Sequence, residues 1–573
     1  MIEKISRCHI VVLGVWGLFL LVSVSLCSAE EISDRLDSRQ PSQSRPELPE
    51  YIPKTPPEGG FVLPPAPTAP KPIAGAAMFE LKGVLFEGNT VLTDDELQAV
   101  VAPFIGQRVG IGELEEIRHR LTRLYIDRGY INSGAIIRPG QTVDEGILTY
   151  TIEEGRLNRI DVTGNDRLQA RYVEKRLWSD SERVFNTNAL QEQFQMLLQD
   201  PLIKRMDGKI RPGAAPGEAV LDLNVTRNRP YSLSITADNQ RPPSTGAERV
   251  VVSGSVQNLT GWGDMWDAAF GISEGADESA LGFSIPLTFR DTLLSLRYSR
   301  NNNAVIEEPL EAIDVESESE NAELSLTHPL FRNARRRLDV GVALAVRQSK
   351  TFLLGRAFSF SPGVENGISQ VSAIRLVQSF VDRTRNQALA LRSTVSFGVD
   401  LFGSTLHSED LPDSRYVTWL GQMQYAHRLG ERFGQILFRG DVQVASDKLL
   451  PLEQFAAGGA DTVRGYRENA LVRDNGCVLS LEWRYPLWKR QAAGGLEEVL
   501  QLTPFMDFGE AWNRGEDHRE EMLHSVGVGL IFTPLPWMSA EVYWAHDIEE
   551  RAAATAYNLQ DDGVHFRVRF TIF

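Results

Sequence analysis

The chain has 573 residues, an ordinary hydrophobic content of 42% and a formal net charge of -17. This length exceeds what one compact domain usually holds, so we expect more than one domain. An acidic chain without a dense Lys/Arg patch repels phosphate backbones, which argues against nucleic acid as a partner. Only Cys477 lies outside the first 29 residues, so the fold does not depend on an intrachain disulfide.

The first 29 residues have the composition of an export signal. A basic start with Lys4 and Arg7 precedes an apolar run, and Cys27-Ser28-Ala29 supplies small residues before a cleavage site. We therefore interpret 1–29 as a signal peptide. Two alternatives stay open. One is a membrane anchor, because about 17 apolar residues could just span a bilayer. The other is a lipoprotein signal at Cys27, although the preceding leucine is bulky for it.

Residues 30–78 are interpreted as a periplasmic linker. Eleven of the chain's 29 prolines lie between 41 and 72, which favours an extended, semi-rigid spacer. The short polar stretch 30–40 before it is compatible either with a helix or with disorder.

Two consecutive segments, 79–154 and 155–228, show the same element order. Each predicts a strand, a Gly-Asn turn, helical text and two further strands. In the first copy, Thr93-Asp94-Asp95-Glu96 has the form of a capping box. Apolar residues recur at three-and-four spacing between Leu114 and Tyr125, and Gly129 ends that helix. In the second copy, 202–211 and 219–227 predict the closing strands.

This repeat resembles the POTRA domain, the polypeptide-transport-associated module of outer-membrane assembly and secretion proteins. The resemblance is carried by Gly88-Asn89-Thr90, by Leu124–Tyr130 and by Glu153-Glu154-Gly155. A generic α+β interaction domain is the alternative. By this resemblance, 79–154 is expected to be POTRA 1 and 155–228 POTRA 2.

After Tyr231, segments of about ten residues alternate apolar and polar. In "LSLEWRYP", Leu481 and Trp483 share one face, while Ser480, Glu482 and Arg484 share the other. Charged residues on one phase suit an aqueous lumen, and an apolar, aromatic phase suits lipid. We count sixteen such segments and predict a transmembrane barrel of about sixteen antiparallel strands over 229–573. A soluble β-sandwich or β-solenoid is the competing interpretation.

Loops and the C-terminus refine the barrel prediction. A long acidic loop is expected at 302–320, and the basic turn 332–337 falls on the inner side. An aromatic last residue is common in outer-membrane barrels. Phe573, however, falls on the polar phase of its strand, which would require a terminal bulge.

The stretch "GGADTVRGYREN" lies between the eleventh and twelfth predicted strands. Its glycines permit a narrow bend, and no Gly-Lys-Ser/Thr follows that would suit a phosphate loop. Read alone, it is an ordinary flexible loop. In "TPFMDFGEAW", Asp507 shares its phase with Gln501 and Thr503, so it is expected to face the lumen.

Two POTRA-like modules before a sixteen-stranded barrel resemble the Omp85 superfamily. Two copies favour its two-partner secretion branch, the TpsB transporters of the hemolysin-activator type. That resemblance implies that Val463, Arg464, Gly465 and Tyr466 form the tip of the sixth extracellular loop, near 448–476, and that Arg464 pairs with Asp507 inside the barrel. Guanidinium–carboxylate pairing is bidentate and directional, which suits an anchor.

The function implied is secretion of one large partner exoprotein, such as an adhesin or hemolysin, across the outer membrane. The expected partners are this exoprotein at the POTRA domains, membrane lipid and the barrel assembly machinery. Neither a cofactor nor a catalytic triad or zinc helix is predicted, so we do not expect an enzyme. The resemblance also implies that 30–40 could plug the barrel. The alternatives are an Omp85-type assembly factor and a passive porin or receptor.

Overall fold

The computed structural model describes residues 43–49, 51–52, 59–62, 78–138, 146–179, 182–408, 410–492, 495–515, 521–548 and 557–572. The expected signal peptide, the possible helix at 30–40 and Phe573 lie outside these ranges. The chain divides into two compact units, one of which contains the barrel and one the region from 55 to 229. Each unit is described by itself.

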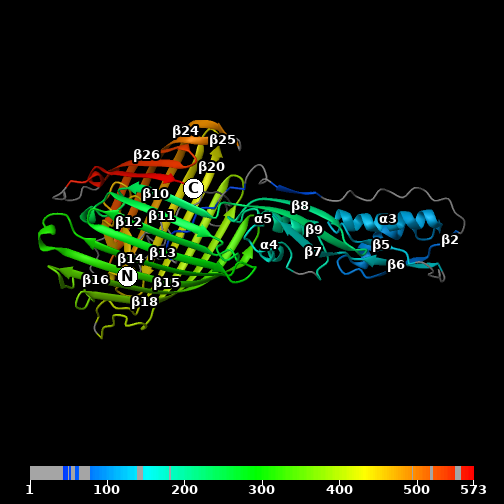
Figure 1. Cartoon of the computed structure of the whole chain (residues 1–573), viewed down its shortest axis with the longest axis horizontal. Helices are drawn as coiled ribbons and strands as arrows, with labels where there is room; N and C mark the ends of the chain where they lie inside the picture. Colours follow the sequence, from blue (N-terminus) through cyan, green and yellow to red (C-terminus); the bar gives the residue numbers. More distant parts are fainter. Residues whose placement is uncertain are drawn as a thin grey trace. The chain divides into compact units, whose positions relative to one another are not determined.

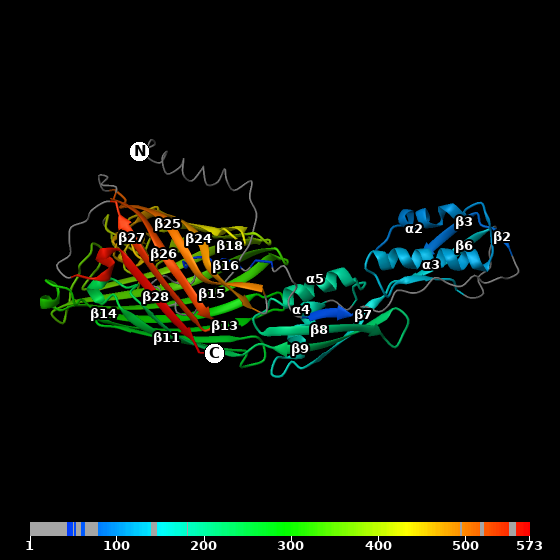
Figure 2. The same ribbon diagram turned by 90° about the horizontal axis from the view of Figure 1, so that it is seen from above.

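The first α+β module has a three-stranded sheet in the order β3-β6-β5, covered by two helices (Figure 2). Its elements are β2 (Phe79–Glu80), β3 (Gly83–Glu87), α2 (Asp94–Val101), β4 (Arg108–Val109), α3 (Ile111–Asp127), β5 (Gly134–Ile136) and β6 (Ile147–Glu153). The predicted capping box is confirmed, because Thr93 and Glu96 bond each other's backbone amides at the start of α2. The α3 helix stops before Gly129, whose φ of 92° is left-handed.

Glu154 explains why the three motif fragments of this module occur together. Its carboxylate accepts hydrogen bonds from the amides of Thr90 and Val91, at 2.7 and 3.0 Å, and from the Tyr125 hydroxyl at 3.1 Å. The Gly-Asn turn, helix α3 and the end of β6 are therefore joined at one carboxylate.

The second module repeats the order strand, helix, helix, strand, strand, as predicted. Its elements are β7 (Arg156–Thr163), α4 (Ala170–Leu177), α5 (Thr187–Leu197), β8 (Ile203–Pro212) and β9 (Glu218–Arg227). Leu190, Phe194 and Leu197 of α5 enter its apolar core. One strand comes from the Pro-rich region: β1 (Gly59–Val62) pairs in parallel with β8 and extends the sheet to β1-β8-β9-β7.

The predicted barrel is confirmed: sixteen antiparallel strands close on themselves when β28 pairs with β10 (Figure 1). These strands are β10 (Tyr231–Asp238), β11 (Arg249–Gln257), β12 (Met265–Ser273), β13 (Ala276–Pro286), β14 (Leu293–Ala304), β15 (Val315–Arg332), β16 (Arg336–Leu353), β18 (Ile368–Arg383), β19 (Gln387–Gly398), β20 (Val417–Gly430), β21 (Gly434–Ala445), β24 (Asn475–Ala492), β25 (Gly495–Trp512), β26 (Glu521–Leu535), β27 (Met538–Asp547) and β28 (Val564–Thr571). A two-residue strand, β17 (Arg356–Ala357), pairs with the end of β16.

Several strands are longer than expected, and one expected loop is shorter. Strands β15, β16, β24 and β25 each have 18 residues rather than about ten. The predicted loop at 302–320 is confined to 305–314, because β14 continues to Ala304 and β15 begins at Val315. Cross-strand pairs of Arg300 with Glu318 and Glu320 accommodate the charges at the start of β15. A strand is recognised in the sequence when apolar and polar residues alternate, and a strand with two polar faces lacks this alternation.

The outer face of the barrel carries the apolar phase. Large apolar side chains there remain accessible, among them Trp266, Phe270, Leu281, Leu296, Leu481 and Met506. The opposite phase is buried and polar, with Ser480, Glu482 and Asp507 inside. A closed sheet that is apolar outside and polar within matches a lipid-embedded barrel and not a sandwich. Within the described ranges, we find no helix that combines the length and apolar character needed to cross a bilayer.

A core substitution tests the first module. Leu121 of α3 is fully buried, so we expect Leu121→Ala to lower the free energy of unfolding of this module by about 2–5 kcal/mol. Hydrogen exchange of the α3 amides measures the change. Ile111→Ala on the same helix is the control, because Ile111 is 50% exposed. Equal protection in both variants would contradict the assigned core.

Candidate functional site

The long connection between β21 and β24, residues 446–474, folds into the barrel and is called loop 6 below. It contains the 3₁₀ turn η5 (Pro451–Glu453) and a small hairpin of β22 (Phe455–Ala457) and β23 (Leu471–Arg473). The hairpin carries the glycine-rich tip that the sequence singled out. Apolar residues from both arms and from the tip form a cluster against the inner wall, so the loop is packed and not loose.

Arg464 at the tip of loop 6 is 1% exposed and pairs with Asp507 of β25. Its Nε and Nη2 atoms donate to the two carboxylate oxygens at 2.8 and 2.9 Å, and its own backbone amide donates to Oδ2 at 3.1 Å. This bidentate geometry fixes the direction of the side chain as well as its charge.

A second carboxylate completes the Arg464 site. Nη1 donates to Glu482 of β24 at 2.5 Å, and Nη2 donates to the Ser480 hydroxyl at 3.1 Å. Glu482 also accepts from Arg484 at 2.7 Å. Four contacts thus bind one guanidinium to two neighbouring strands of the wall.

Two aromatic rings cover the Arg464 guanidinium. Its Cζ lies 3.5 Å from the ring centroid of Phe505 and 5.0 Å from that of Tyr543. Cation–π attraction grows when a cation is withdrawn from water, as it is here. The rings also keep water away from the ion pairs, which strengthens the electrostatic attraction.

The remaining tip residues bring the loop into contact with the wall. Val463 is fully buried in the apolar cluster of loop 6, and the Tyr466 hydroxyl donates to the His524 carbonyl at 3.0 Å. Gly465 has a left-handed φ of 93°, and a Cβ built on it would lie 2.9 Å from the Cβ of Ala545. The structure therefore brings all four tip residues of the predicted site and Asp507 together.

A second buried ion cluster holds the base of loop 6. Glu453 accepts from Arg375 of β18 at 2.7 and 3.0 Å and lies 3.4 Å from Arg347 of β16. Gln443 of β21 donates to the Glu453 carbonyl at 2.9 Å. Loop 6 is thus attached by an arginine to carboxylates of β24 and β25, and by a glutamate to arginines of β16 and β18.

Residues 43–49 and 51–52, expected only to be spacer, lie along the inner wall of β19–β21. Arg45 forms an ion pair with Asp441 at 2.7 Å and donates to the Asp461 carbonyl of loop 6 at 2.6 Å. Gln43 donates to Glu453 at 3.1 Å, and the Arg428 guanidinium stacks on the Tyr51 ring at 3.2 Å. This N-terminal segment therefore shares the lumen with loop 6.

Sequence reasoning missed part of this site. Glu482 was within reach, because it lies on the polar phase of the same strand stretch that predicted the lumen face. Nothing in the local pattern identified Glu453 or Gln43, whose partners lie 78 and 410 residues away. Among the described residues, no group of His, Cys, Asp and Glu side chains is suited to hold a metal ion.

Comparison with known proteins matches two family models. Residues 217–532 match the family described as haemolysin secretion/activation protein ShlB/FhaC/HecB. Residues 79–155 match the ShlB-type POTRA domain.

Individual proteins give the same result. The chain is 23% identical over 475 residues to the outer membrane transporter CdiB of Dickeya dadantii, covering 81% of this chain and 82% of the relative. It is 22% identical over 487 residues to the heme/hemopexin transporter protein HuxB of Haemophilus influenzae, covering 78% and 80%. The solved structure of CdiB from Escherichia coli superposes with a TM-score of 0.65 at 23% identity, covering 87% of this chain and 91% of that one.

A glycine substitution tests whether the tip depends on close packing. We expect Gly465→Ala to move the tip away from Asp507 and raise ion conductance in planar bilayers, because the added methyl collides with Ala545. Gly515→Ala is the matched control. Gly515 also has a left-handed φ, of 80°, but its Cβ would be 3.7 Å from its nearest neighbour. Equal conductance in both variants would show that the left-handed backbone, and not the collision with Ala545, causes the change in conductance.

Proposed function

Because the chain belongs to the haemolysin secretion/activation family ShlB/FhaC/HecB, we propose that it exports one large partner protein through its barrel to the cell surface. The barrel lies in the bacterial outer membrane and the POTRA modules lie in the periplasm. The observation that carries the proposal is a pore-forming fold whose lumen is occupied by a loop held through Arg464. A barrel of this size can enclose an aqueous channel once its contents move aside.

The exported chain is proposed to arrive unfolded at the POTRA modules. An extended segment can add to a terminal strand of a sheet through main-chain hydrogen bonds, which depend little on side chains. Terminal strands are β3 and β5 in the first module and β7 in the second. Residues 59–62 support this mode of binding, since they pair with β8 as an added parallel strand.

Loop 6 and the N-terminal segment are proposed to close the pore at rest. Both occupy the lumen, and Arg45 and Gln43 connect them. Export then requires that these contacts be exchanged for contacts with the passing chain. Folding of the exported protein outside is proposed to give the movement its direction.

The further partners are membrane lipid around the apolar outer face and the barrel assembly machinery during insertion. The family consists of transporters. We assign no catalytic step to this chain.

Loss of the Arg464 guanidinium tests the role of the tip. We expect Arg464→Ala to lower secretion strongly while the barrel stays folded, because it leaves Asp507 buried without its cation, at about 3–5 kcal/mol, while Glu482 keeps Arg484. Secretion of the exoprotein and heat-modified gel mobility measure the two effects.

Arg473→Ala is the control for that variant. Arg473 lies in the same loop, but its pair with Glu521 is partly exposed and worth at most about 1 kcal/mol. Wild-type secretion by Arg464→Ala would refute the proposed role.

Deletion of residues 79–228 separates the alternatives. Loss of a single secreted protein supports export, and broad loss of other barrel proteins indicates an assembly factor. If neither changes, the chain acts as a passive porin or receptor.

A further inference from the structure

The seam between the first and last strands is the shortest contact in its part of the barrel. Strand β28 pairs with β10 through five residue pairs, from Ser234–Thr571 to Asp238–Arg567. The flanking contacts are longer, with eight pairs between β10 and β11 and seven between β27 and β28. Fewer ladder hydrogen bonds make the seam the easiest place for the sheet to separate.

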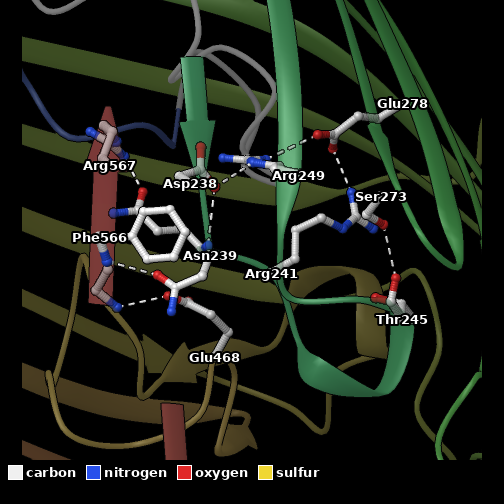
Figure 3. Close-up of polar contacts among 12 residues, drawn as sticks. Asp238, Asn239, Arg241, Thr245, Arg249, Ser273, Glu278, Glu468, Phe566 and Arg567 are labelled. Carbon is white, nitrogen blue, oxygen red and sulfur yellow. Dashed lines mark hydrogen bonds and ion pairs between the residues drawn. The ribbon is translucent and has the colours of Figure 1, made fainter. Parts of the chain in front are cut away.

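Asn239 continues the seam where the regular ladder stops. Its side-chain amide donates to the Val564 carbonyl at 2.9 Å and accepts from the Phe566 amide at 2.8 Å. These two bonds add to a main-chain bond from the Asn239 amide to the Phe566 carbonyl at 3.3 Å, and Figure 3 shows Asn239 beside Phe566 of β28. Asn239 is fully buried.

The other side of β10 is held by charge. Arg249 of β11 donates to Asp238 at 2.9 Å and to Glu278 of β13 at 3.0 Å. Arg241 donates to the second oxygen of Glu278 at 2.7 Å, so both arginines meet at one carboxylate (Figure 3). Ion pairs fix β10 to its neighbours on this side, whereas on the β28 side the neutral amide of Asn239 and a bond from Arg567 to Gln240 hold the end of the ladder.

Gln560 connects this end of the seam to loop 6. Its Nε2 donates to the carbonyls of Asn239 and Arg241 at 2.6 and 2.7 Å, and its Oε1 accepts from the Glu468 amide at 2.9 Å. It lies in the 3₁₀ turn η6 (Leu559–Asp562), between β27 and β28, and is 1% exposed. One amide thus bonds the chain just after β10 on one side and the residue four positions after Arg464 on the other.

The tip of loop 6 also holds β28 and the turn before it. The Gly465 amide donates to His565 of β28 at 3.3 Å. Arg467 forms ion pairs with Asp561 of η6 at 2.5 Å and with Glu307 at 2.8 Å. The loop tip therefore secures the strand that Gln560 and Asn239 fasten to β10.

We propose that Gln560 is a positioning residue that couples loop 6 to the β10–β28 seam. With the tip seated on Asp507, Gln560 holds the outer end of the seam closed. When the tip withdraws, Gln560 loses the Glu468 amide and the seam loosens. The role of this coupling in export rests on the proposed function. Conductance is measured without an exoprotein, so the coupling and the export function are tested separately.

The test uses the full chain reconstituted in planar bilayers. Gln560→Ala should raise the open fraction roughly tenfold, since it removes a buried amide that bonds three main-chain groups. Gln560→Glu is the second variant. It keeps the acceptor for Glu468 but loses both donors to β10, so it tests the seam even if the alanine variant folds poorly.

Gln443→Ala is the matched control. Gln443 is also a buried glutamine whose Nε2 donates to two carbonyls, those of Glu453 and Asp474, at the base of loop 6 and not at the seam. It should loosen the base of the loop while the tip stays on Asp507, and so leave the seam intact. A disulfide between Ala237→Cys and Val568→Cys, which are paired residues of β10 and β28, then staples the seam.

The disulfide distinguishes conductance that requires an opened seam from conductance that requires only a loosened loop 6. We expect oxidation to return the Gln560 variants to wild-type conductance, to leave Gln443→Ala unchanged, and to be reversed by a reductant. Wild-type conductance in both Gln560 variants would overturn the coupling. Conductance that stays above the wild-type level after the disulfide has formed would also overturn the coupling, because those ions would then pass around loop 6 without any opening of the seam.

Discussion

A guanidinium withdrawn from water between two carboxylates is the interaction on which the interior of this barrel depends. Arg464 reaches Asp507 and Glu482 with side chains that are almost completely buried. A buried ion pair contributes little net stability, because desolvation offsets its attraction. Its value lies in geometry, since the charges are compensated only when the loop tip occupies one position. The same logic applies at Glu453, where the sign of the charges is reversed. Two clamps of opposite polarity prevent the loop from seating in a shifted register.

The clamps extend beyond the loop itself. Residues after the tip contact η6, β28 and, through Gln560, the end of β10. A barrel sheet is closed by its first and last strands, so a loop that touches both can sense and influence closure. Arg241 and Arg249 keep β10 fixed to the rest of the sheet. If the sheet separates at this end of β10, we therefore expect it to separate between β10 and β28.

The sequence predicted the architecture because alternation and module repetition are local signals. The polar phase of "TPFMDFGEAW" was enough to place Asp507 in the lumen, and the same argument placed Glu482 on the polar face without identifying it as a partner of Arg464. Strand lengths were underestimated, since β15 continues through a polar stretch where no apolar face marks it. Contacts such as Gln43 with Glu453 were out of reach, because they depend on which parts of a long chain meet inside a closed wall. The internal hairpin of loop 6 was missed for the same reason: its two three-residue strands are stabilised by packing and not by local pattern.

The way the inner wall holds residues 43–49 and 51–52 has a consequence for which other chain segments it can bind. Arg392 donates to the Ser44 carbonyl at 2.7 Å, Gln424 donates to the Pro46 carbonyl at 2.8 Å, and the Ile52 amide donates to Thr384 at 3.0 Å. All three hydrogen bonds are made to main-chain groups of the segment, which do not depend on the side chain. Beside the side-chain contacts of Gln43, Arg45 and Tyr51, this part of the inner wall therefore presents donors and acceptors that a main chain of any sequence can bond.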